Sequence, residues 1–173
     1  MSLNYYELFE LNPLFNIDLA ALESNYRKIQ SEAHPDRFVT ASAAEKLNSM
    51  RRATLANEAY QTLKNPANRA KYLLELQGIT AISETNTAMP IDFLMQQMEW
   101  REATEVATAS QNIAALENLL NEIRAEAHSL QKNLVSLLDE KKDYTAATDA
   151  TRKLIFIDKV SEDLHGAIEQ IDL

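Results

Sequence analysis

Residues 18–36 read DLAALESNYRKIQSEAHPD, and this stretch predicts a helix followed by a tight loop. Asp18 can cap the helix, because its side chain accepts hydrogen bonds from the free amides of the first turn. Proline pushes the residue before it out of the α region, so the helix should end at His34. The loop then presents an imidazole, a rigid ring and a carboxylate together, which suits contact with a partner and offers no obvious nucleophile. Apolar residues at alternating spacings of three and four predict the buried face: Leu19, Leu22, Tyr26, Ile29 and Ala33.

The rest of the first half predicts three further helices. A short one is expected near residues 4–9 and another over 43–64, where Asn65-Pro66 should end it. A fourth, over 67–77, should end at Gly78, because glycine suits the left-handed position after a helix. The residues of the 43–64 helix that we expect to face inward are Leu47, Met50, Tyr60 and Leu63.

The second half predicts a linker and three long helices. Residues 79–89 show no periodicity and are rich in Thr, Ser and Asn, which indicates the linker. Pro90 can begin a helix that runs to about residue 109, Ser110 is expected to cap the next, and Asp143 to start the last. Two helices carry regular apolar stripes: Leu116, Leu120, Ile123, Ala127, Leu130, Leu134 and Leu137, then Ala147, Ala150, Leu154, Ile157, Ser161, Leu164 and Ile168. Such helices joined by tight turns predict an antiparallel three-helix bundle.

Composition favours an all-α protein and excludes several kinds of site. The 173 residues contain Gly 2 and Pro 4, very few turn formers for this length. Cysteine is absent, which excludes disulfides, thiolate metal sites and cysteine nucleophiles and fits a reducing compartment. No apolar run is long enough to span a bilayer, and the first residues lack a signal-peptide pattern. We therefore expect a cytoplasmic protein with no membrane partner.

The net charge of −9 is concentrated in the second half. Nine basic residues balance nine acidic ones up to Gln77, whereas eight basic residues face seventeen acidic ones from Gly78 onward. This asymmetry predicts two units, and it argues against nucleic acid as a partner of the second.

The loop of His34, Pro35 and Asp36 has two interpretations. In the simpler one it is a helix-ending turn in which Asp36 makes a local hydrogen bond. In the other, its context matters: Tyr26-Arg27-Lys28 precedes it, and the stretch from Asn57 to Tyr72 follows in the right order. Together these residues, over Asn4 to Leu76, resemble a J-domain, the module by which co-chaperones engage DnaK-type chaperones.

The J-domain resemblance implies roles for six residues. His34, Pro35 and Asp36 would contact the ATPase domain of the chaperone and trigger hydrolysis of ATP there. Arg27, Lys28 and Arg37 would form a positive face toward an acidic chaperone surface, a pairing that mainly sets encounter rate and orientation. Many J-domains have tyrosine before the histidine and lysine after the aspartate. Here Ala33 and Arg37 stand at those positions, so the charge is kept and only local packing changes.

A helical wheel of the first bundle helix predicts an exposed apolar patch. Phe93, Gln97, Trp100, Thr104 and Ala107 share one face, and Leu94, Met95 and Met98 fall away from it, beside Glu99 and Glu102. Phe156 lies similarly off the apolar stripe of the last helix. An apolar cluster ringed by carboxylates suggests a partner site, and methionine suits such a surface. The alternative is a rotated wheel, with the patch facing the first unit.

The whole chain resembles the HscB family, J-type co-chaperones of iron–sulfur cluster biogenesis. Three segments carry the resemblance: 69–74 (RAKYLL), 92–99 (DFLMQQME) and 152–159 (RKLIFIDK). It implies a J-domain in residues 1–78, a linker in 79–89 and, packed against the J-domain, a three-helix bundle in 90–173. The implied partners are the chaperone HscA and the scaffold protein IscU.

The implied scaffold-binding residues are Leu94, Met95, Met98, Glu99, Glu102 and Phe156. Met98 replaces a leucine common in the family, which an apolar contact should tolerate. Eukaryotic members often begin with a cysteine-rich zinc segment, so this sequence is more similar to bacterial ones.

Two other functions remain to be distinguished from this one. A J-domain protein serving general unfolded clients would also use an exposed apolar patch. An enzyme with a carboxylate-bridged metal site would need Glu-x-x-His pairs on facing helices, and Glu162-x-x-His165 provides only one. His128 and His165 have no ligand set at zinc spacing, and no phosphate-binding or nucleophile motif is present. We therefore expect no metal, no cofactor and no enzymatic activity.

Overall fold

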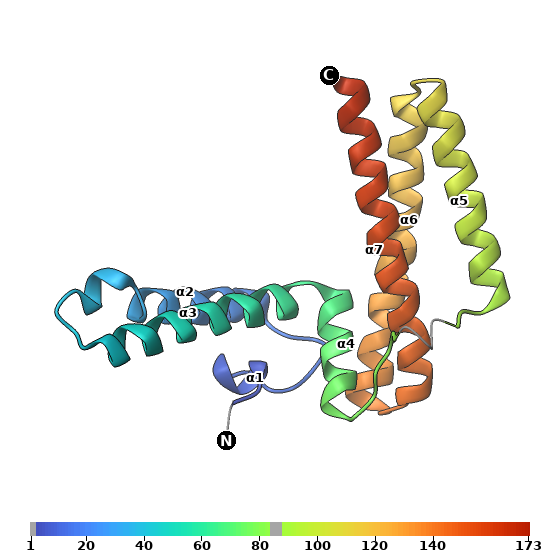
Figure 1. Ribbon diagram of the computed structural model, residues 1–173. Coiled ribbons are helices and arrows are strands. Elements are labelled where there is room, and N and C mark those ends of the chain that lie inside the picture. Colours follow the sequence, from blue (N-terminus) through green and yellow to red (C-terminus); the bar gives the residue numbers. More distant parts are fainter. Residues whose placement is uncertain (1–2, 84–87) are drawn as a thin grey trace. The chain divides into compact units, whose positions relative to one another are not determined.

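The computed structural model describes residues 3–83 and 88–173, and all the regular structure in these ranges is helical (Figure 1). The chain divides into two compact units, Met1–Leu73 and Leu74–Leu173. The all-α fold is therefore confirmed. None of the helices in the described ranges combines the length and apolarity needed to cross a membrane.

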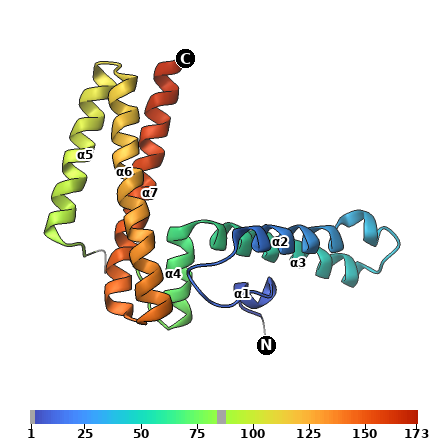
Figure 2. The ribbon, with the colours of Figure 1, turned by 180° about the vertical axis from the view of Figure 1, so that it is seen from behind.

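The first unit is built around a hairpin of two helices, α2 (Leu19–Glu32) and α3 (Ala43–Lys64), which run antiparallel (Figure 2). A short α1 (Tyr5–Leu8) precedes them, and a 3₁₀ turn η1 (Pro35–Phe38) lies in the loop between them. The next helix, α4 (Pro66–Leu76), begins in this unit and ends in the second. The predicted cap holds, because Asp18 accepts hydrogen bonds from the amides of Ala20 and Ala21. Tyr26 and Tyr60 stack across the hairpin with ring centroids 4.1 Å apart.

Three residues predicted to face inward in this unit are exposed instead, so those predictions were wrong. Leu19 is 52% exposed, Leu47 45% and Met50 62%. The buried face of α3 is made of small side chains at Ser49, Ala56 and Ala59, together with Leu63. Small residues let two helices approach closely, so the larger apolar residues of α3 are not needed in the contact.

The second unit is an antiparallel bundle of three helices, α5 (Ile91–Ala109), α6 (Ile113–Leu134) and α7 (Tyr144–Asp172), as Figure 1 shows. The predicted stripes of α6 and α7 line its core, since Leu116, Ile123, Leu134, Leu154 and Leu164 are almost fully buried. The N-cap of α7 is also as predicted: Asp143 accepts a hydrogen bond from the amide of Ala146.

The turn between α5 and α6 differs from the prediction. Ser110 does not cap α6; its hydroxyl donates to the carbonyls of Val106, at 2.9 Å, and Ala107, at 3.3 Å. The cap is Asn112, whose side chain accepts a hydrogen bond from the amide of Ala115 at 3.0 Å. A serine hydroxyl can bond back to the turn before it as well as forward, and here the backward bonds form.

A π-helical segment, η2 (Val135–Glu140), continues α6 toward the last turn. The amide of Lys141 donates to the carbonyl of Ser136 at 2.9 Å, five residues back, in place of the usual four. The wider turn brings both Leu137 and Leu138 into the core.

The backbone after α4 is held by a cap and an arginine. Gly78 has φ 77°, and its amide and that of Ile79 donate to the carbonyls of Glu75 and Leu74, the pattern of a Schellman motif. Residues 79–89, predicted as a linker, include four that lie outside the described residues (84–87). Arg152, on α7, is buried and donates from Nε to the carbonyl of Ala81 at 2.5 Å and from Nη1 to that of Ala88 at 3.3 Å. The described parts of this segment are therefore tied to the bundle.

Candidate partner-binding sites

The loop that ends α2 presents His34, Pro35 and Asp36 to solvent. His34 has the extended backbone expected before proline, with φ −64° and ψ 137°, and Pro35 begins η1. The carbonyl of His34 accepts a hydrogen bond from the amide of Arg37 at 3.0 Å. The loop is therefore an ordered turn with exposed side chains.

The imidazole of His34 is oriented by Asp36. Its Nδ1 accepts a hydrogen bond from the backbone amide of Asp36 at 3.2 Å, and the Asp36 carboxylate lies 3.6 Å from the same nitrogen. With Nδ1 engaged inside the loop, Nε2 is the ring nitrogen available to a partner. Asp36 therefore makes a local hydrogen bond, as the simpler interpretation of the loop expects, but through its backbone amide and with the His34 side chain as the acceptor. This hydrogen bond also positions the imidazole.

The three basic residues predicted to surround the loop are all exposed, but they differ in their ion pairs. Arg27 forms an ion pair with Glu23, one turn earlier on α2, at 2.6 Å. Lys28 borders a small hollow of about 100 Å³ whose lining includes Glu10 and Glu32. Arg37 lies within η1 itself. The basic surface is therefore partly neutralised by carboxylates of the same unit.

Sequence reasoning did not single out Arg52, which ties the end of α2 to α3. Its guanidinium lies 2.9 Å from the carboxylate of Glu32, two residues before His34. Both side chains are partly exposed, so the pair contributes little to stability. The pair nonetheless shows which part of α3 lies beside the end of α2. The adjacent Arg51 and Arg52 could have suggested an ion pair on α3. Which carboxylate they meet, however, depends on how α2 and α3 are aligned in the hairpin.

The apolar patch predicted on α5 is exposed. Leu94 is 43% exposed, Met95 56% and Met98 70%, while Phe93 and Trp100 are buried and meet edge to face. The helical wheel is therefore confirmed, with Phe93 and Trp100 on the core face of α5. Glu99 and Glu102 are exposed beside the patch, as predicted.

Phe156, on α7, is half-buried. One turn earlier, the ammonium of Lys153 lies 5.8 Å from the ring centroid of Phe93, so this part of α7 runs beside the start of α5. Phe156 thus lies on the neighbouring helix near the level at which the patch begins. The position of a cation beside the ring of Phe93 was not predicted.

The remaining histidines do not form a metal centre in the described part of the chain. His128 and His165 are exposed, and Nε2 of His165 lies 3.5 Å from the guanidinium of Arg124. Glu162 and His165 share one face of α7, yet no group of three His, Asp or Glu side chains suited to a metal ion occurs among the described residues.

Comparisons with known proteins give a consistent result. Residues 89–165 match the family model of the HSCB C-terminal oligomerisation domain. The co-chaperone protein HscB homolog of Burkholderia thailandensis is 47% identical over 169 residues, 98% of this chain and 96% of that protein, and its counterpart in Burkholderia multivorans is 46% identical over the same shares. Chaperone HscB from Vibrio cholerae has a similar structure, with a TM-score of 0.86 at 38% identity, over 98% of this chain and 99% of that one. The human co-chaperone protein HscB also has a similar structure, with a TM-score of 0.87 at 29% identity, over 99% of this chain and 84% of that one.

Proposed function

The chain belongs to the HscB family of co-chaperones, and from this premise we propose that it stimulates ATP hydrolysis by the DnaK-type chaperone HscA and delivers the scaffold protein IscU to it. Iron–sulfur cluster assembly in the cytoplasm is the process it serves. It acts as an adaptor, with no cofactor and no catalytic residues of its own. The observation that carries the proposal is the ordered, exposed His34-Pro35-Asp36 loop at the end of the helical hairpin.

Residues 1–78 carry the chaperone-stimulating part of this function. His34 meets the ATPase domain through Nε2, because Nδ1 is held by the Asp36 amide. Pro35 keeps the loop short and rigid, and Lys28 and Arg37 supply positive charge for the encounter, since Arg27 shares its charge with Glu23.

Residues 90–173 carry the scaffold-binding part, and residues 79–89 join the two. Leu94, Met95 and Met98 form the apolar contact, with Phe156 on the neighbouring helix. Glu99 and Glu102 at the edge favour a partner with basic residues and disfavour an acidic one. Two modest contacts on one chain raise the local concentration of scaffold at the chaperone, which explains why the two modules are joined.

The first test is the ATP turnover of HscA with and without this protein. We expect His34→Gln to abolish the stimulation while the fold is retained, because His34 is exposed and its replacement removes no buried contact. His128→Gln is the matched control, an exposed histidine in the bundle that should leave stimulation unchanged. Full stimulation by His34→Gln would show that the proposed role of the loop is wrong.

The second test is titration calorimetry against IscU and against a denatured client protein. We expect selective binding of IscU, weakened about tenfold by Leu94→Ala or Phe156→Ala, because apolar anchors dominate interface energies. Leu19→Ala, at an exposed leucine of the first unit, is the control. Equal affinity for the denatured client would favour the general-client function instead.

A further inference from the structure

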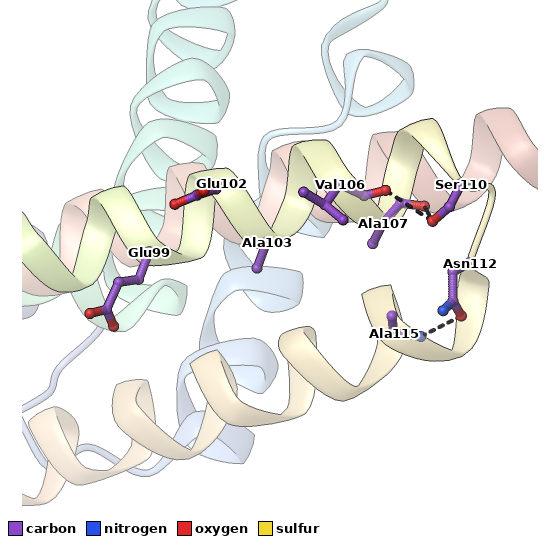
Figure 3. Close-up of a pocket in the computed structure, with 8 residues that line it drawn as sticks. All are labelled: Glu99, Glu102, Ala103, Val106, Ala107, Ser110, Asn112 and Ala115. Atoms are coloured by element: carbon purple, nitrogen blue, oxygen red, sulfur yellow. Dashed lines mark hydrogen bonds between the residues drawn. The ribbon is translucent and has the colours of Figure 1, made fainter.

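A groove with a cavity volume of about 410 Å³ lies between the second half of α5 and the first turn of α6 (Figure 3). Its inner surface is largely aliphatic. Ala103, Val106 and Ala107 line it from α5, and Ala115 lines it from α6. The small side chains leave the space open, and Val106 is 64% exposed at its border.

Two polar side chains at the α5–α6 turn make hydrogen bonds within the chain. The Ser110 hydroxyl donates to the carbonyls of Val106 and Ala107, and the Asn112 side chain accepts from the amide of Ala115, as the dashed lines in Figure 3 show. Most of the other lining at this end is methyl surface from alanine and valine, which favours an apolar occupant.

Two carboxylates lie at the other end of the groove, those of Glu99 and Glu102. Neither forms an ion pair with a residue in the described ranges, whereas Glu105 is paired with Arg101 at 3.3 Å. The negative charge at this end is thus available to a cation from outside. The second half of the chain, with its excess of acidic residues, adds a field of the same sign.

The groove is continuous with the apolar patch. Met98, Glu102 and Val106 follow one another at spacings of four on α5, so they lie along one side of the helix. A partner segment that covers Met98 therefore passes Glu99 and Glu102 on its way to Val106.

We propose that this groove takes an aliphatic side chain of the scaffold protein, from a segment that carries a lysine or arginine next to it. The aliphatic group fills the space between Ala103 and Ala115, and its basic neighbour pairs with Glu99 and Glu102. The inference rests on the proposed function and extends the scaffold site from α5 and α7 to the start of α6.

The test fills the groove without touching the patch. Ala103→Leu places a larger side chain inside it, and Ala114→Leu, at an exposed alanine of α6 outside the groove lining, is the matched control. In calorimetry with purified IscU, Ala103→Leu should weaken binding by about ten- to a hundredfold, the loss that corresponds to one unburied aliphatic side chain. Ala114→Leu should bind like the parent protein.

A second variant keeps the inference testable if Ala103→Leu does not fold, which circular dichroism would show. Val106→Lys changes an exposed side chain and brings a cation to the groove, so it should repel the basic segment and weaken binding at low salt more than at high salt. If both variants bind IscU like the parent while Leu94→Ala binds it weakly, the groove is not part of the site and the proposed function stands. If Leu94→Ala also binds IscU normally, both the groove and the scaffold-binding role of the apolar patch are wrong, whereas the stimulation of HscA is tested separately by His34→Gln.

Discussion

Replacing Arg152 by methionine is expected to destabilise the second unit by about 2 kcal/mol. Arg152 is buried, and its Nε donates to the buried carbonyl of Ala81 at 2.5 Å. A hydrogen bond made by a charged group contributes about 1.5–3 kcal/mol, and the longer, partly exposed bond to Ala88 adds about 0.5–1 kcal/mol. The contact with Asp149 at 3.9 Å adds little, because that carboxylate is half exposed.

The burial of the guanidinium offsets part of this gain. Methionine has no charge to remove from water, so the variant avoids the desolvation cost of the guanidinium. The methionine side chain also fills most of the volume of the arginine side chain, so no large cavity forms. The net effect is therefore smaller than the sum of the hydrogen bonds, about 2 kcal/mol.

The assay is urea unfolding followed by the fluorescence of Trp100. This is the one tryptophan of the sequence, and it is buried in α5, so its emission reports the second unit. Arg101→Met is the control: Arg101 is exposed and paired with Glu105, and its loss should change the free energy of unfolding by less than about 0.5 kcal/mol. If Arg152→Met unfolds at the same urea concentration as Arg101→Met, the hydrogen bonds to Ala81 and Ala88 do not stabilise the bundle.

Three further predictions concern local features. Leu47→Ser should change the free energy of unfolding by no more than about 0.5 kcal/mol, whereas Leu63→Ala should cost about 2–5 kcal/mol, as measured by circular dichroism in urea; equal effects would contradict the burial of α3. Asp143→Ala removes the N-cap of α7 and should cost about 1 kcal/mol in the Trp100 assay, and an unchanged midpoint would mean that the cap contributes nothing. Glu23→Gln releases Arg27 and should increase HscA stimulation about twofold at low salt, with no difference at high salt; a decrease would show that the ion pair itself is needed.

The helix ends were predictable because their signals are local. Asp18 and Asp143 cap the helices that follow them, and Gly78 has the positive φ that its place after a helix suggested. The wheel of α5 was predictable too, because Phe93 and Trp100 mark a single core face. Such features depend on a few neighbouring residues and on helical geometry alone.

The errors arose where contacts between helices decide the outcome. Leu47 and Met50 fit an inward stripe, yet the contact between α2 and α3 uses Ser49 and the alanines of α3, and a small residue gives no strong signal in a sequence. The Ser110 hydroxyl could have capped α6 or formed hydrogen bonds with the last carbonyls of α5, and the local sequence does not distinguish the two. The sequence placed Arg152 in a segment that resembles the HscB family, but its hydrogen bonds to backbone carbonyls were not predicted. Those carbonyls lie about 70 positions away in the chain.

The π-helical turn of η2 has a consequence for chain length. A deletion of one residue within 135–140 can convert the wide turn to an ordinary α-turn, and the apolar register of α6 before it stays as it is. A deletion in the middle of α6 would instead rotate every later core leucine by about 100°. Natural length differences of one codon in this bundle should therefore cluster at 135–140, and an alignment of relatives that places them inside α6 would contradict this.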